Sequence, residues 1–138
     1  MPITVDDRVG AVELADVIRA MHVEVEVKRI PYGDFAFEGN GPKGKCLVGV
    51  ERKKVRDLLA CQEDKRFAAH QLPGMIEAYS YVYLILEGRY SVDTDTLELT
   101  EPCGGSWRPI RLGPSRKIMY RDFDNYLNSL ATQTSLII

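Results

Sequence analysis

Residues 33–57 read GDFAFEGNGPKGKCLVGVERKKVRD, and this stretch decides the fold. Residues 46–51 are apolar and partly β-branched, which predicts a buried strand that leads into a Glu-Arg-Lys triplet at 51–53. Residues 34–37 predict the preceding strand, and the glycine- and proline-containing segment 41–44 predicts the turn between the two. The stretch therefore predicts a hairpin with charged side chains on both of its strands.

The charged residues of this hairpin are suited to phosphodiester hydrolysis. Asp34 and Glu51 belong to neighbouring strands, and two carboxylates can hold Mg²⁺ or Mn²⁺ through oxygen ligands. Because residues i and i+2 point to one face of a strand, Glu51 and Lys53 share a face and Arg52 points to the other. A lysine there can polarise a water molecule or stabilise charge on a phosphate. Asp34 lies near Glu51 only in the right hairpin register, which the sequence leaves open.

The same residues resemble the signature of a known family. Gly-Asp followed by Glu-Arg-Lys-x-x-x-Asp is typical of the XPF-type structure-specific endonucleases, and this chain carries it at 33–34 and 51–57. Residues 5–8, Val-Asp-Asp-Arg, are similar to the family's first strand, and residues 83–88 to a later core strand. The resemblance covers residues 3–88. It implies an α/β restriction-endonuclease-like PD-(D/E)XK fold, with a central mixed β-sheet flanked by helices.

The chain departs from the family pattern at two positions. The family usually has a glutamine three residues after the hydrophobic residue that follows an arginine, and here His70 stands at that position. Val9 replaces a glutamate close to the expected site. These departures concern substrate preference more than activity. The helix–hairpin–helix domain of many members is also missing, so we expect residues 1–138 to form a single stand-alone nuclease domain, as in phage proteins, or a fragment.

The resemblance implies an endodeoxyribonuclease of DNA repair or recombination that cuts branched DNA such as flaps, forks or junctions. The reaction would be metal-dependent hydrolysis without a covalent intermediate. Asp34 and Glu51 would ligate Mg²⁺ or Mn²⁺, and Asp6 would lie beside them as an outer ligand or water holder. Lys53 would contact the nucleophilic water or the phosphate.

Further charged residues are expected to support this chemistry. Arg52 and Asp57 belong to the signature, and we expect them to hold the site as an ion pair. Arg8 and Lys54 are expected phosphate contacts. The remaining candidates for DNA binding are Arg66, Arg108 and Arg111.

Charge is unevenly distributed along the chain, although the net charge is only −2. Basic residues outnumber acidic ones between residues 43 and 66, and the segment 103–121 contains basic residues and no acid. Because salt screens distant charges, such local patches determine the attraction of phosphates. Residues 107–121, rich in glycine and proline, predict a surface loop. This loop either solubilises the domain or lies along the DNA backbone, with Trp107 able to stack on an unpaired base.

Hydrophobic periodicity predicts alternating strands and helices. Beyond the hairpin, the predicted strands are 3–6, 23–30 and 81–86, with a second hairpin over 88–100 and a last strand or frayed end over 135–138. The predicted helices are 12–22, 54–63, 66–79 (with Pro73 breaking or restarting it) and 119–130. The last helix carries a wide apolar stripe. It predicts either packing against the sheet or the interface of a homodimer.

Length and composition agree with one globular domain. A chain of 138 residues can bury a core of its own. No apolar run is long enough for a membrane span and no secretory leader is evident, so we expect no membrane partner. The expected location is the cytoplasm (of the host, if the gene is phage-encoded) or a eukaryotic nucleus. Three widely spaced cysteines predict reduced thiols rather than a zinc site.

Two other functions remain open at the level of sequence. One is a different nuclease of the same fold, such as a DNA-end-processing exonuclease or a restriction enzyme. The other is a catalytically silent module that binds DNA or pairs with an active partner. Silent members of the family usually lose the acids or the lysine, and this chain keeps all of them.

Overall fold

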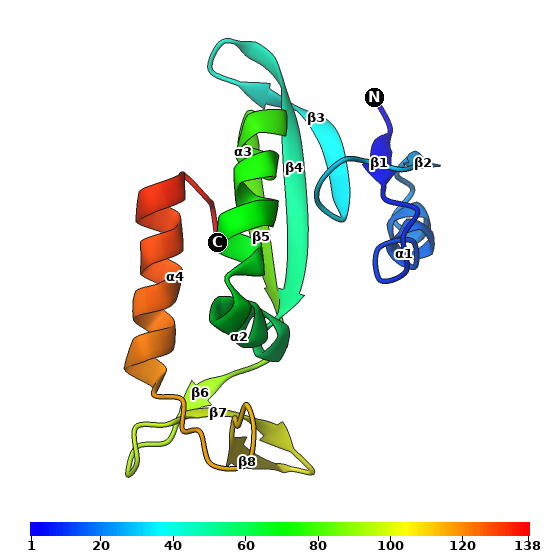
Figure 1. Cartoon of the computed structure of the whole chain (residues 1–138). Helices are drawn as coiled ribbons and strands as arrows, with labels where there is room; N and C mark the ends of the chain where they lie inside the picture. The colour runs from blue at the N-terminus through cyan, green and yellow to red at the C-terminus, as the bar shows by residue number, and fades with distance from the viewer.

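A computed structural model describes all residues from Met1 to Ile138. Its centre is a five-stranded sheet with the strand order β2-β1-β3-β4-β5 (Figure 1). Strand β3 is antiparallel to both β1 and β4, whereas β1–β2 and β4–β5 are parallel pairs, so the predicted mixed sheet is confirmed. The strands are β1 (Ile3–Val5), β2 (Val25–Val27), β3 (Phe35–Gly41), β4 (Gly44–Lys54) and β5 (Tyr81–Glu87).

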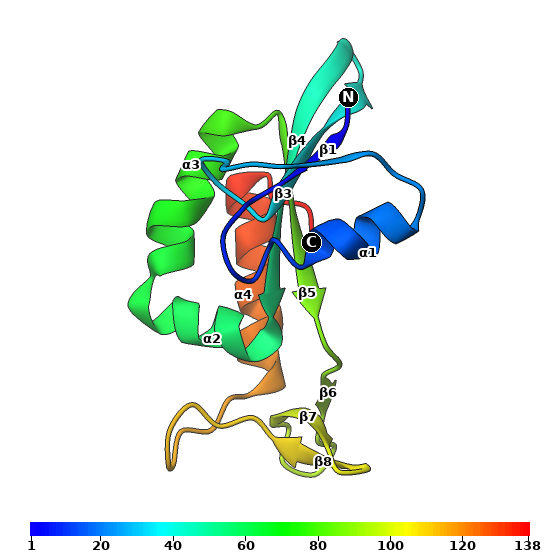
Figure 2. The same cartoon turned by 90° about the vertical axis from the view of Figure 1, so that its right-hand side faces the viewer.

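Helices cover the two faces of this sheet unequally. Helix α1 lies on one side, and the other helices lie on the opposite side (Figure 2). These other helices are α2 (Val55–Asp64), the π-helix η1 (Phe67–Gln71), α3 (Leu72–Ala78) and α4 (Tyr120–Thr134), and α1 comprises Leu14–Ala20. The main core of 17 buried residues lies on the side with four helices, and a cluster of three, Val5, Ala15 and Ile18, lies under α1. Most of the apolar burial that stabilises the fold therefore lies on one face of the sheet.

The β3–β4 hairpin matches its prediction. The two strands pair from Phe35 with Val50 to Gly41 with Gly44, and Pro42 and Lys43 form the turn. Gly49 in β4 lies against the ring of Tyr79, and a Cβ there would come within 2.2 Å of that ring. The glycine thus lets the helical layer approach the strand closely.

Two strand predictions need correction. Residues 81–86 were predicted to be a buried strand, but in β5 only alternate residues such as Val82 are buried, and Tyr83 and Ile85 are exposed. The reason is that β5 lies at the edge of the sheet and helices cover only one of its faces. The predicted strand over 23–30 shrinks to Val25–Val27, because it pairs only with the three-residue strand β1.

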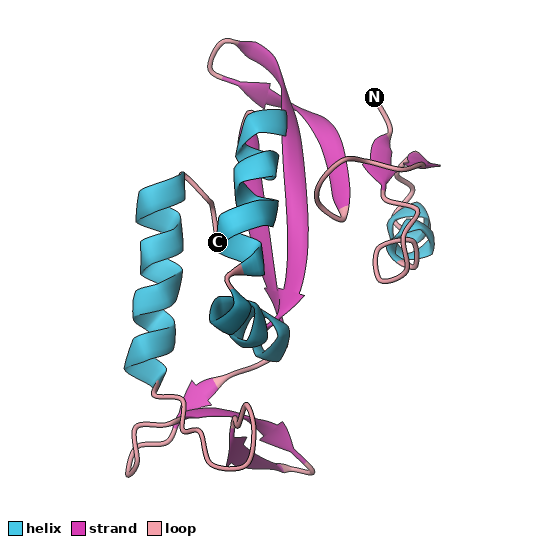
Figure 3. Cartoon of the chain, viewed as in Figure 1, coloured by secondary structure: helices cyan, strands magenta, loops and turns pink.

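A second, three-stranded sheet lies beyond the end of β5 (Figure 3). It consists of β6 (Ser91–Val92), β7 (Leu99–Cys103) and β8 (Ser106–Pro109). The predicted hairpin over 88–100 is confirmed by the pairing of β6 with β7. The prediction of a loop from residue 107 is wrong in its first part, since β8 pairs with β7. Gly104 and Gly105, both with positive φ, form the tight turn that makes this pairing possible.

The apolar stripe of the C-terminal helix packs against the rest of the molecule. Phe123 and Leu130 of α4 are buried in the main core, which is the first of the two predicted uses of the stripe. The homodimer stays a prediction, without the support of this stripe. After α4 the chain forms a single bridge between Tyr83 and Ile137 at the sheet edge. No helix is both long and apolar enough to cross a membrane, and the three cysteines are free.

Candidate active-site cleft

The hairpin register places Asp34 opposite Glu51. Phe35 pairs with Val50, and the Asp34 amide donates a hydrogen bond of 2.8 Å to the Val50 carbonyl. The Asp34 carboxylate in turn accepts a hydrogen bond of 2.7 Å from the Arg52 amide. These bonds fix both the backbone and the side chain of Asp34 against β4. The sequence left the hairpin register open, and the structure shows the register that places Asp34 and Glu51 in a common site.

Gly33 has a structural reason to precede Asp34. Its φ is +86°, in the left-handed region that side chains disfavour, and a Cβ would lie 2.9 Å from the Val50 carbonyl oxygen. The Gly-Asp pair thus lets the chain turn tightly onto β4 just before the acid.

Glu51 and Lys53 share one face of β4, as predicted. The Glu51 side chain is almost fully buried, and the Lys53 Nζ lies 2.7 Å from its Oε1. The Lys53 ammonium also lies 5.9 Å from the centre of the Phe67 ring, which η1 contributes. Buried partners therefore hold the acid and the lysine in one geometry.

Arg52 points to the opposite face, but the ion pair predicted between Arg52 and Asp57 is wrong. Arg52 forms an ion pair with Glu87 of the neighbouring strand and donates a hydrogen bond of 3.3 Å to the Gly10 carbonyl. Asp57 lies exposed in the first turn of α2 and lines the same cleft as Arg52, but no ion pair joins the two side chains. Arg52 instead ties the segment before α1 to the edge of β4.

Burial dominates the ionisation of the two acids. It raises the pKa of Asp34, against the opposing effect of the Arg52 amide. It also raises the pKa of Glu51, where Lys53 opposes the shift and the nearby Asp34 charge adds to it. Burial lowers the pKa of Lys53, but the contact with Glu51 outweighs it, and the net direction is upward. Two desolvated acids beside one ammonium make a site that favours additional positive charge.

These side chains line an open cleft of about 1050 Å³ between the sheet and the α2–η1 segment. A second hollow of about 510 Å³ continues it toward α1 and shares Asp34, Glu51, Lys53 and Asp57 with it. Further charged residues on the walls are Asp6, Arg8, Arg52, Lys54, Arg66 and Glu87. The structure thus brings together most of the site residues that the sequence predicted.

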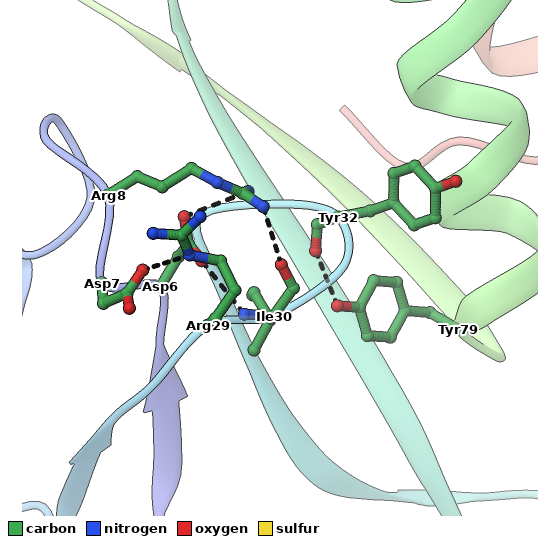
Figure 4. A network of polar contacts seen from close by, with 7 residues as sticks. All are labelled: Asp6, Asp7, Arg8, Arg29, Ile30, Tyr32 and Tyr79. Carbon is green, nitrogen blue, oxygen red and sulfur yellow. Dashed lines mark hydrogen bonds and ion pairs between the residues drawn. The ribbon is translucent and has the colours of Figure 1, made fainter.

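Asp6 is buried and engaged with its neighbours (Figure 4). One carboxylate oxygen accepts a hydrogen bond of 3.0 Å from the Ile30 amide, and the other lies 3.2 Å from the Arg8 guanidinium. Arg8 also donates to the Ile30 carbonyl, and Arg29 lies 3.9 Å from Asp6. Asp6 therefore anchors the loop before Gly33, and its role as an outer metal ligand stays a prediction.

The predicted basic patch over 103–121 is not an uncompensated one. Each of its arginines before residue 120 pairs with an acid from another part of the chain. The pairs are Arg108 with Glu101, Arg111 and Lys117 with Glu98, and Arg116 with Glu63. The contact with Arg111 also lowers the pKa of the Glu98 carboxyl. Roles in DNA binding for Arg108 and Arg111 stay predictions, and both guanidiniums are engaged in ion pairs.

The other predicted DNA contacts lie around the cleft. Lys54 is exposed and forms no ion pair, while Arg8 and Arg66 line the cleft and pair with Asp6 and Asp64. No set of three or more His, Cys, Asp or Glu side chains converges on a single point where it could hold a metal. The acids that line the cleft are Asp6, Asp34, Glu51 and Asp57, of which Asp34 and Glu51 lie opposite each other.

One residue of the cleft was missed by the sequence reasoning. The amide of Gln71 hydrogen-bonds the Glu51 carboxylate and slightly opposes the rise that burial causes in the Glu51 pKa. The family pattern pointed to position 70 instead, where His70 is exposed. The signal in the sequence that could have identified this residue was the presence of a glutamine at position 71, one position after the expected one.

Comparisons with known proteins agree with this fold. A sequence model described as the ERCC4 domain matches residues 5–101. No curated protein matches significantly. The solved structure of XPF from Aeropyrum pernix is similar, with a TM-score of 0.65 and 20% identity, over 99% of this chain and 51% of that one. A second structure, XPF from Aeropyrum pernix in complex with DNA, has a TM-score of 0.63 and 19% identity, over 99% and 54%. This chain thus spans about half the length of those chains, and at these identities the likeness concerns the fold.

Proposed function

Because the chain belongs to the ERCC4 domain family, we propose that it is a nuclease domain that hydrolyses phosphodiester bonds in DNA with the help of a divalent metal ion. The observation that supports this most strongly is the convergence of Asp34, Glu51 and Lys53 in one open cleft. Asp34 directly precedes β3, the other two residues belong to β4, and the pairing of these strands brings all three together. An acid pair with an adjacent ammonium matches the needs of metal-assisted hydrolysis.

The donor set suits Mg²⁺ or Mn²⁺. Asp34 and Glu51 offer hard carboxylate oxygens, and burial leaves their charge poorly solvated. Mg²⁺ commonly takes only one or two protein carboxylates and fills its other positions with water and substrate phosphates. A bound ion would act as a Lewis acid on the scissile phosphate and lower the pKa of a water molecule.

The protein's own residues have distinct tasks in this proposal. Asp34 and Glu51 would hold the ion and so orient the phosphate. Lys53 keeps its proton because Glu51 raises its pKa, so it donates a hydrogen bond to the attacked phosphate or the water. Asp57, exposed at the start of α2, reaches the same cleft and can accept a proton or a hydrogen bond from water.

The proposed substrate is DNA with a junction between duplex and single strand, such as a flap or a fork. The cleft is open and continues toward α1, so it can take a strand that enters and leaves. One similar solved structure, XPF from Aeropyrum pernix, is described as a complex with DNA. The arginines and the lysine around the cleft would contact backbone phosphates.

A cleavage assay with the whole chain tests this function. Labelled flap, fork and blunt duplex DNA are incubated with Mg²⁺, with Mn²⁺ and with EDTA. We expect internal cuts in the flap or fork with either metal and none in EDTA. Stepwise loss of nucleotides from the duplex end would favour an exonuclease instead. Binding of all three DNAs without any cleavage would overturn the catalytic proposal and leave a silent DNA-binding module.

The charge pairs around the cleft predict which cations matter for DNA affinity. Lys54 has no acidic partner, so Lys54→Ala should weaken DNA binding and reduce the slope of log affinity against log salt by about 0.9. Arg108→Ala is the matched control, because Arg108 pairs with Glu101 and lies outside the cleft. Fluorescence anisotropy in EDTA over a salt series measures the DNA affinity and its salt slope for each variant. Equal losses in the two variants would contradict this assignment and restore the predicted basic patch.

A further inference from the structure

The helix that follows α2 contains one wide turn beside the cleft. In η1 the Leu72 amide donates to the Phe67 carbonyl, a bond to the fifth residue back rather than the fourth. Phe67 and Leu72 are both fully buried in the main core, although five residues separate them. In a regular α-helix the residue under Phe67 would be the fourth one on, Gln71. The wide turn therefore adds one residue between two core-facing positions.

This extra residue decides which side chain faces the cleft. The residue before the core-facing position would be His70 in a regular helix, and it is Gln71 in the observed one. His70 is exposed at the rim, whereas Gln71 is half-buried on the cleft wall. The shift by one position accounts for the displaced glutamine of the family pattern.

Gln71 and Phe67 contact the two partners of the central ion pair. The Gln71 amide hydrogen-bonds the Glu51 carboxylate, and the Phe67 ring lies beneath the Lys53 ammonium. Glu51 and Lys53 lie 2.7 Å apart, so one turn of η1 supports both of them. Short π-helical turns within longer helices often occur at functional sites.

We propose that Gln71 is a positioning residue that orients the Glu51 carboxylate in the cleft, and that the π-turn of η1 is the device that places Gln71 rather than His70 there. The role of Gln71 rests on the proposed nuclease function, whereas its contact with Glu51 does not. A side-chain amide can donate to a carboxylate without adding charge. It thereby fixes the direction of the oxygens and leaves their charge available to a metal ion.

Two single variants and a double variant test the assignment by cleavage. Gln71→Ala should lower kcat about ten- to a hundredfold, as losses of outer-shell partners commonly do, with KM for DNA within about twofold. His70→Ala, at the neighbouring exposed position, should leave both within about twofold of the parent. The exchanged variant, His70→Gln with Gln71→His, keeps the composition and should be as impaired as Gln71→Ala. Full activity of the exchanged variant, or equal losses in the two alanine variants, would overturn the proposal.

A second measurement tests the contact between Gln71 and Glu51 and does not depend on catalysis. In the metal-free protein, the side-chain amide resonances of Gln71 should shift when Glu51 is replaced by glutamine, and those of the distant Gln133 should not. If the parent chain cleaves no DNA, the proposed function fails while this shift still reports on the contact. An unshifted Gln71 amide would overturn the contact itself. Thermal unfolding verifies that each variant is folded.

Discussion

Glu51→Gln and Asp34→Asn are each expected to lower the cleavage rate by about a thousandfold, while DNA affinity in EDTA changes by no more than a few fold. Each change keeps the shape of the side chain and removes a charge that would hold the metal. Affinity depends mainly on contacts to backbone phosphates, and neither acid makes such contacts. Single-turnover cleavage of flap DNA and anisotropy in EDTA measure the two quantities separately.

Glu77→Gln is the matched control for this pair. Glu77 lies exposed on α3 and does not line the cleft, so its charge should not affect cleavage. A variant of Asp34 or Glu51 that cleaves near the parent rate would remove that residue from the site. Loss of cleavage in all three variants would indicate instead that removing any of these negative charges disturbs the fold.

Gly33→Ala is expected to damage both stability and cleavage. The positive φ costs a non-glycine residue about 1–2 kcal/mol, and the contact of 2.9 Å between the new Cβ and the Val50 carbonyl adds about 1–3 kcal/mol. Relief of that contact would move Asp34 away from Glu51. Because a displacement of about 1 Å can cost a hundredfold in rate, we expect a loss of about that size in the fraction that remains folded. Urea unfolding and single-turnover cleavage measure the two effects.

Gly44→Ala separates the two causes. Gly44 also has a positive φ, of +112°, but nothing lies within 4 Å of the position of a Cβ. Its free energy of unfolding should therefore fall by only about 1–2 kcal/mol, with cleavage unchanged. If both variants lose the same stability and both retain cleavage, the close contact at Gly33 does not position Asp34.

Local sequence patterns were enough to predict the central hairpin of this protein. Alternation and β-branched residues before Glu51 predicted β4, and the glycine–proline turn at 41–44 predicted its hairpin, since both depend on residues close in sequence. The i, i+2 geometry of a strand was enough to place Glu51 beside Lys53 and Arg52 away from both. The mixed sheet was expected from a specific motif rather than from periodicity alone, whereas the strand order came from the structure.

Contacts between residues far apart in the sequence decided the rest. The partner of Arg52 is Glu87, because parallel pairing of β4 with β5 brings them together, and no local pattern identifies that pairing. Most of the basic run after residue 103 is paired with acids from β7 and its neighbourhood and from α2, which a count within the run cannot detect. Gln71 rather than His70 is the half-buried residue on the cleft wall, in a turn that is wide enough for Phe67 and Leu72 both to enter the core. The sequence by itself therefore determined most of the elements that form and which side chains are candidates for the chemistry. Only the packed structure decided their partners, because charge pairing and helix register follow from the burial of distant residues against one another.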